Sequence, residues 1–76
     1  MNFTTATDRA TRASITLADI GTACGVSRSA IDRARMDPQS PHARQPPEGW
    51  QGCISKLCRK RALDLLKLAD ALEPEG

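Results

Sequence analysis

Apolar and polar residues between positions 15 and 36 alternate with the period of an α-helix, with one interruption at Gly25. Apolar residues recur at spacings of three and four on both sides of that glycine, so each side forms one apolar face. They are Leu17, Ile20 and Cys24 before the glycine, and Ile31 and Ala34 after it. The pattern predicts two short helices joined by a tight turn, with their apolar faces packed together.

Capping residues mark where these helices begin and where the first one ends. Thr16 and Ser27 precede the helical runs and carry hydroxyl groups that accept hydrogen bonds from free backbone N–H groups. Asp19 places negative charge in the first turn of the first helix. Gly25 stands where that helix has to end in left-handed backbone, which glycine adopts without a Cβ penalty. We therefore expect a positive φ at Gly25.

The segment from Leu17 to Ile31 resembles the helix-turn-helix of Cro-like and lac-repressor-type DNA-binding proteins, and it resembles small phage or mobile-element transcriptional regulators. The resemblance lies in small residues in the first helix and the turn, followed by β-branched residues and a serine. These are Gly21, Gly25, Val26, Ser27 and Ile31. The family usually has alanine in place of Gly21, and glycine costs a helix interior about 0.5 to 1 kcal/mol relative to alanine. A simple αα-hairpin of a small bundle is the alternative interpretation.

The resemblance implies a sequence-specific transcriptional regulator, with repression as the expected mode, whose second helix enters the major groove of double-stranded DNA. Ser27 would bind phosphate at the helix start, and the exposed side chains of the second helix would reach base edges. Further cations would contact the DNA backbone. The expected DNA-contacting residues are Ser27, Arg28, Ser29, Asp32, Arg33, Arg35 and Arg44. Four cations between Lys56 and Arg61 form a second basic cluster, which is either a phosphate contact or a solvated helix face.

A proline-rich connection separates this region from a second apolar run. Residues 37–47 contain four prolines, which favour a stiff, extended chain. Residues 48–73 then follow helical spacing up to the helix-breaking Pro74. The apolar stripe is Trp50, Ile54, Leu57, Cys58, Leu65, Leu68, Ala69 and Leu72. The pattern predicts one long amphipathic helix, with Cys24 and Cys58 as small buried residues.

This long helix offers more apolar surface than one short helical hairpin can cover. We therefore expect a homodimer through Leu65, Leu68 and Leu72, which would also present two reading helices to a pseudo-palindromic site. The alternative is a monomer whose long helix folds back over its own hairpin. A different function class also remains open: a small helical protein-interaction module, inhibitor-like or antitoxin-like, that uses the leucine-rich face.

The N-terminal residues 1–14 are rich in threonine and alanine and nearly lack large apolar side chains. They predict either a frayed arm or a weak helix from about Thr5 to Ala13, in which Asp8 and Arg12 are four apart. Either form would bring the arginines of this segment near DNA.

Composition supports a single all-α domain and narrows the function classes. The 76 residues include only two aromatic side chains, and alanine and leucine favour helices over a β-barrel. The sequence contains no nucleophile with an evident base and no phosphate-binding glycine loop, so we expect no enzyme, cofactor or small-molecule ligand.

Cysteine usage and hydropathy bear on the compartment, on metal binding and on membrane association. Three cysteines and no N-terminal hydrophobic signal favour the cytoplasm, where thiols stay reduced. Cys53 and Cys58 are five apart and no CxxC pair occurs, so we expect no metal site. No apolar run approaches the length of about 20 residues that spans a bilayer, so we expect no membrane partner.

Overall fold

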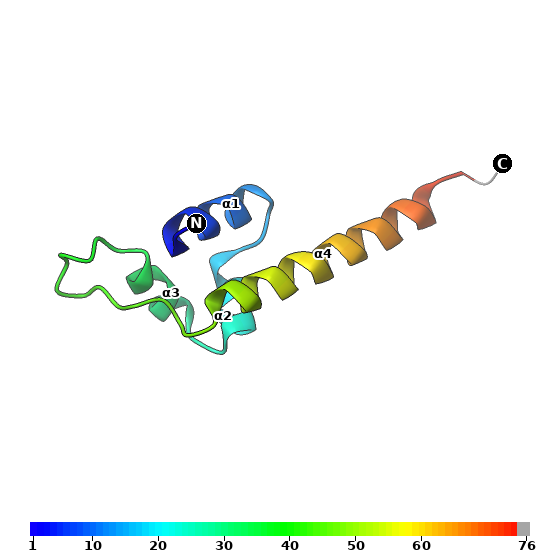
Figure 1. Ribbon diagram of the computed structural model, residues 1–76. Coiled ribbons are helices and arrows are strands. Elements are labelled where there is room, and N and C mark those ends of the chain that lie inside the picture. The colour runs from blue at the N-terminus through cyan, green and yellow to red at the C-terminus, as the bar shows by residue number, and fades with distance from the viewer. Residues whose placement is uncertain (75–76) are drawn as a thin grey trace.

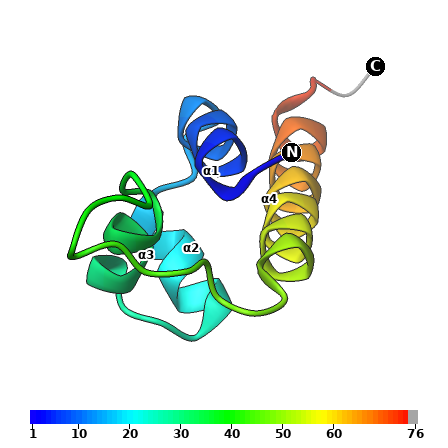
Figure 2. The same cartoon turned by 60° about the vertical axis from the view of Figure 1, so that its left-hand side comes forward.

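The computed structural model describes residues 1–74, and these form four helices and no strand (Figure 1). The helices are α1 (Phe3–Arg12), α2 (Leu17–Cys24), α3 (Arg28–Ala34) and α4 (Trp50–Leu72). The all-α prediction is therefore confirmed for the described chain. Figure 2 shows α1, α2, α3 and the first turns of α4 gathered around a common centre, from which the rest of α4 projects. The molecule measures 59 × 20 × 20 Å as a result.

The N-terminal segment is a packed helix in the structure, not a frayed arm. Asn2 caps α1, since its side-chain oxygen accepts a hydrogen bond of 2.8 Å from the backbone N–H of Thr5. Phe3, Thr7 and Ala10 are buried on one side of the helix. The Thr7 hydroxyl donates to the Phe3 carbonyl oxygen at 2.9 Å, which satisfies this buried polar group. The sequence underestimated α1 because its buried residues are mostly small or polar.

The caps of α2 and α3 form as predicted. The Thr16 hydroxyl accepts from the Asp19 backbone N–H at 3.0 Å, and the Asp19 carboxylate accepts from the Thr16 backbone N–H at 3.1 Å, which completes a capping box. The Ser27 hydroxyl accepts from the Ala30 N–H at 3.1 Å. Gly25 ends α2 with a φ of 71°, so the prediction of a left-handed turn is confirmed.

We expect Gly25→Val to destabilise the fold by more than about 1 kcal/mol, because left-handed backbone is strained for a β-branched residue. No atom lies within 4 Å of an added Cβ at this position, so the cost would come from the backbone and not from a steric clash. Urea unfolding measures the loss. Gly25→Asn is the control, since asparagine tolerates left-handed backbone better, and an equal loss in both variants would contradict this explanation.

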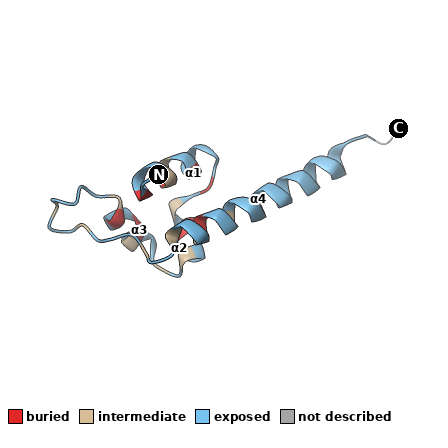
Figure 3. Ribbon diagram, in the orientation of Figure 1, coloured by how far each residue is buried: buried red, intermediate tan, exposed pale blue. Residues whose placement is uncertain are grey.

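The core lies where the four helices meet, and Figure 3 shows that buried residues gather there and leave most of α4 exposed. Its centre consists of Ile20 from α2 and Ile31 from α3, both fully buried. Phe3 of α1 meets Trp50 of α4 edge to face, with ring centroids 5.3 Å apart. The remaining buried apolar residues are Ala10, Ile15, Ala34 and Ile54. The aromatic contact joins the start of the chain to its last helix.

The predicted C-terminal helix is confirmed, but it begins two residues later than expected and leaves the core after about three turns. Gly49 has a φ of 73°, which breaks helical geometry before Trp50 and leaves Glu48 outside α4. Cys58 is exposed, so its expected burial is wrong. Ile54 and Leu57 of the same helix pack in the core, and Cys58 is not among the core residues. Residues 62–72 are all exposed, so within the described chain α4 does not fold back over the hairpin.

The proline-rich connection is more folded than a stiff extended spacer. Two turns interrupt it, closed by hydrogen bonds from Ser40 N–H to the Asp37 carbonyl at 2.8 Å and from Ala43 N–H to the Ser40 carbonyl at 3.1 Å. The connection then returns to α3, where Arg44 N–H donates to the Arg33 carbonyl at 3.1 Å. Prolines alone therefore did not predict its path, because Asp37 and Ser40 accept the hydrogen bonds that close the turns.

Within residues 1–74, no helix combines the length and the apolar character that crossing a bilayer requires.

Candidate nucleic-acid interface

The outer face of α3 is an exposed row of polar and charged side chains on an anchored helix. Arg28, Ser29, Asp32 and Arg33 are all exposed, as the sequence predicted. On the opposite side of α3, Ile31 and Ala34 are buried in the core. The burial of these two residues fixes the rotation of α3 about its axis, and therefore also the direction in which its polar side chains point.

Arg28 and Asp32 lie one turn apart and form an ion pair on this face, with 3.9 Å between Arg28 Nε and an Asp32 carboxylate oxygen. Both side chains are about half exposed or more. An exposed pair of this kind contributes little to stability. Arg28 can therefore exchange Asp32 for another hydrogen-bond acceptor at small cost.

Arg35 lies at the C-terminal end of α3, where it is the capping residue. Its guanidinium pairs with the Asp8 carboxylate of α1, and its side chain is only 27% exposed. This contact joins α3 to α1. Sequence reasoning placed Arg35 among the DNA-backbone contacts, whereas in the structure it is occupied within the protein. The two residues are 27 positions apart, so no local pattern pointed to their pairing.

Arg44 lies beside α3, although it belongs to the connection. Its backbone N–H is bonded to the Arg33 carbonyl, while its side chain is exposed. Arg44, Gln45 and Pro47 also border an open hollow of about 410 Å³ with Val26 and Ala30. The structure thus brings Arg44 next to the helix that carries Arg28 and Arg33.

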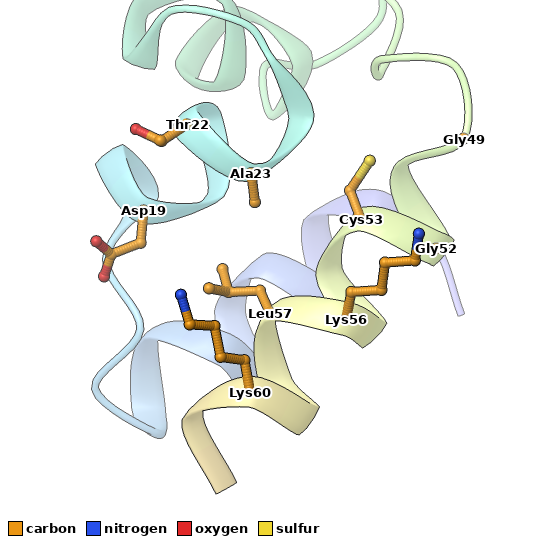
Figure 4. A pocket seen from close by; sticks show the side chains of 9 residues that line it. All are labelled: Asp19, Thr22, Ala23, Gly49, Gly52, Cys53, Lys56, Leu57 and Lys60. Atoms are coloured by element: carbon orange, nitrogen blue, oxygen red, sulfur yellow. The ribbon is translucent and has the colours of Figure 1, made fainter. Parts of the chain in front are cut away.

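The second basic cluster borders a groove between α2 and α4 (Figure 4). The groove has a volume of about 600 Å³, and Lys56 and Lys60 project from α4 beside it. Lys56, Arg59 and Lys60 are exposed. The remaining cation, Arg61, is held within the protein, because it pairs with Asp19 at 3.3 Å and donates to the Ser14 carbonyl at 3.3 Å. Three of the four cations are therefore solvated.

Hydrogen bonds from the Thr16 backbone and hydroxyl lower the pKa of Asp19 below its ordinary value of 3.8, and Arg61 lowers it further. A carboxylate with a depressed pKa in the folded state stabilises the fold fully above its ordinary pKa and loses that effect as pH falls through the folded value. We expect the difference in unfolding free energy between the wild type and Asp19→Asn to be largest at about pH 7 and to shrink below about pH 4. Urea unfolding at both pH values measures it, and a difference that does not change with pH would contradict the role of the charge.

Cys24 of α2 and Cys53 of α4 are neighbours, and Cys53 lines the same groove (Figure 4). Burial, followed by the adjacent Cys53 thiol, raises the pKa of Cys24 to about 11. The Cys24 thiol therefore stays protonated at neutral pH and is a poor nucleophile or metal ligand. Within residues 1–74, no three potential ligands among His, Cys, Asp and Glu lie close enough together to hold a metal ion.

The structure thus groups Arg28, Ser29, Asp32, Arg33 and Arg44 as exposed residues, whereas Arg35 is paired with Asp8 of α1. Ser27 lies at the start of the same face, with its hydroxyl already accepting the capping bond. Leu65, Leu68 and Leu72 are exposed on the projecting half of α4, residues 62–72.

A comparison of the chain with models of known protein families, with curated proteins and with solved structures gives no match.

Proposed function

We propose that the protein is a sequence-specific DNA-binding transcriptional regulator that reads double-stranded DNA with the outer face of α3. The observation that carries this proposal is the exposed row Arg28, Ser29, Asp32 and Arg33, opposite the fully buried Ile31. The major groove admits an α-helix, and arginine, serine and aspartate are side chains that hydrogen-bond to base edges. A reading helix has to be held rigidly, and here the burial of Ile31 and the Gly25 turn hold it.

Phosphate contacts would come from cations around this face. Arg44 is tied by its backbone to the end of α3 and has a free side chain, which suits it to the DNA backbone. The exposed Lys56 and Lys60 of α4 are further candidates. Arg35 is not one of them in this proposal, because Asp8 already holds it. We propose repression as the mode of regulation, since occupying a site is sufficient to block it, and the cytoplasm as the compartment.

Selection of bound sequences from random duplex DNA with the purified protein tests this function. We expect enrichment of an inverted repeat, because two copies related by a two-fold axis read the same half-site twice. A single enriched half-site would support DNA reading without the dimer. If no sequence is enriched at low salt, the protein does not read DNA.

The exposed leucines of α4 favour one alternative, a helical protein-interaction module. Leu65, Leu66, Leu68 and Leu72 are all more than half exposed, and a helix of this kind can bind in the groove of another protein. Salt separates the two functions, since phosphate contacts weaken steeply as salt rises whereas an apolar interface changes little.

The proposed regulator is a homodimer through the projecting half of α4, and Leu68→Glu should dissociate it. The substitution places an unpaired charge in an apolar interface. Sedimentation at several concentrations measures the change from dimer to monomer. Leu63→Glu is the matched control, because Leu63 is 58% exposed against 54% for Leu68 but lies about 140° away around the helix. A wild-type monomer at high micromolar concentration would contradict the dimer.

A further inference from the structure

The projecting half of α4 carries large and small residues in a seven-residue repeat. Leu65 and Leu72 are seven apart, and so are Ala62 and Ala69, each three residues before a leucine. This is the spacing of residues along the seam of a coiled coil. All four are exposed, and we call them the seam.

We propose that the seam pairs in antiparallel orientation with the same seam of a second copy, which specifies the geometry of the homodimer proposed above and rests on it. In a pair symmetric about Lys67, Leu65 faces the partner's Ala69 and Leu72 faces the partner's Ala62. Every layer then holds one leucine and one alanine and has the same volume. A parallel pair would place alanine against alanine and leucine against leucine, which leaves alternate layers underfilled.

The residues that flank the seam fit the same orientation. Leu66 and Leu68 lie on either side of the seam next to the symmetry axis, where each would meet its own copy. Further out, Arg59 would face the partner's Glu73, so opposite charges meet at both ends of the interface. The charged residues of this half of α4 lie outside the interface; they are Asp64, Lys67 and Asp70.

The length of the free helix matches the length of this pairing. Arg61 is the last residue of α4 that hydrogen-bonds to the rest of the protein, to Ser14 and Asp19. The helix ends at Leu72, shortly before Pro74. In the antiparallel pair the partner's Leu72 lies opposite Ala62, one residue beyond Arg61. The end of each helix therefore lies opposite the residue that follows Arg61, and the pairing covers the segment of α4 that projects from the core in Figure 1.

The pairing also fixes the distance between the two cores. Ile54, which anchors α4 in the core, lies 13 residues before Lys67. At 1.5 Å per residue, the two Ile54 positions are about 39 Å apart along the helix axis. Half-sites one turn apart on DNA are separated by about 34 to 36 Å. The reading helix α3 lies beyond the start of α4, farther from Lys67 than Ile54 is (Figure 1), so antiparallel pairing suits an inverted repeat whose half-sites are more than one turn apart. Parallel pairing places both cores side by side at one end.

Disulfide crosslinking in the absence of DNA tests the orientation. In a Cys58→Ser background, Leu68→Cys lies next to the symmetry axis, and copper–phenanthroline with oxygen should convert most of the protein to a covalent dimer. Leu72→Cys in the same background is the matched control, because its two copies would be about 15 Å apart. We expect at least tenfold less covalent dimer from it. Mixing Ala62→Cys chains with Leu72→Cys chains should restore crosslinking.

The native Cys58 gives an independent readout. Its two copies are about 27 Å apart in the antiparallel pair, so wild-type protein should not crosslink through this residue. Parallel pairing would bring Cys58 against its own copy, and crosslinking of wild type and of Leu72→Cys would overturn the proposal. Failure of every variant to crosslink would overturn it too. If Leu68→Cys crosslinks but no DNA sequence is enriched, the pairing holds and the regulator function fails.

Discussion

Replacing Gly21 with alanine should destabilise the protein, although alanine is the better helix former. A Cβ added to Gly21 would lie 2.9 Å from the Val26 carbonyl oxygen and 3.4 Å from the Arg28 nitrogen. Both neighbours are backbone atoms, so the turn between α2 and α3 would have to move. Overpacking typically costs about 1 to 3 kcal/mol, and the gain in helix propensity returns only about 0.5 to 1 kcal/mol. We expect a net loss of up to about 2.5 kcal/mol in the free energy of unfolding.

Gly52→Ala is the matched control, because Gly52 also lies inside a helix but has no heavy atom within 4 Å of an added Cβ. Gly52→Ala should raise the free energy of unfolding by about 0.5 to 1 kcal/mol, because alanine has a higher helix propensity than glycine. In urea unfolding, Gly21→Ala should therefore be less stable than the wild type and Gly52→Ala more stable. If Gly21→Ala is stabilised as much as Gly52→Ala, then α2 and the turn are not in close contact at this position.

Gly21 shows where sequence reasoning reached its limit. From the sequence, this glycine departs from the usual alanine of the resembled family and should only weaken α2. In the structure it leaves room for the backbone of the turn, and Val26 N–H donates to the Gly21 carbonyl at 2.9 Å. Local signals predicted the caps at Thr16 and Ser27 and the turn at Gly25, since each depends on residues within one helical turn. The close approach to Gly21 depends on how two helices pack.

The same limit explains which cations were misjudged. Arg33 and Arg35 look alike in the sequence, but one is exposed and the other is paired with Asp8, 27 positions away. Arg61 likewise belongs to a basic run, yet it pairs with Asp19, 42 positions away. Charge along the chain therefore did not separate solvated cations from structural ones. The outward orientation of Arg28 and Arg33 was predictable, because the helical period fixes it once Ile31 and Ala34 are buried.

Alanine substitutions should separate base reading from backbone contact among the arginines around α3. Arg28 and Arg33 lie on the exposed face, where an arginine can hold a guanine by two hydrogen bonds. We expect Arg28→Ala or Arg33→Ala to cost about 1 to 3 kcal/mol at the preferred site and to relax the preference at one base pair. Arg44→Ala should weaken all sequences alike and reduce the salt slope by about one unit, because it removes one phosphate contact.

Binding curves on the preferred site and on random DNA, each at two salt concentrations, measure these effects. Arg44→Ala leaves the backbone bond between positions 44 and 33 in place, so it tests the guanidinium alone. Lys67→Ala is the control for loss of one positive charge, since Lys67 is exposed on the projecting half of α4 and should change neither affinity nor preference. If Arg28→Ala and Arg33→Ala both leave affinity and preference intact, α3 does not read DNA. The leucine-faced half of α4 would then become the functional surface, and a protein partner would replace DNA as the ligand to seek.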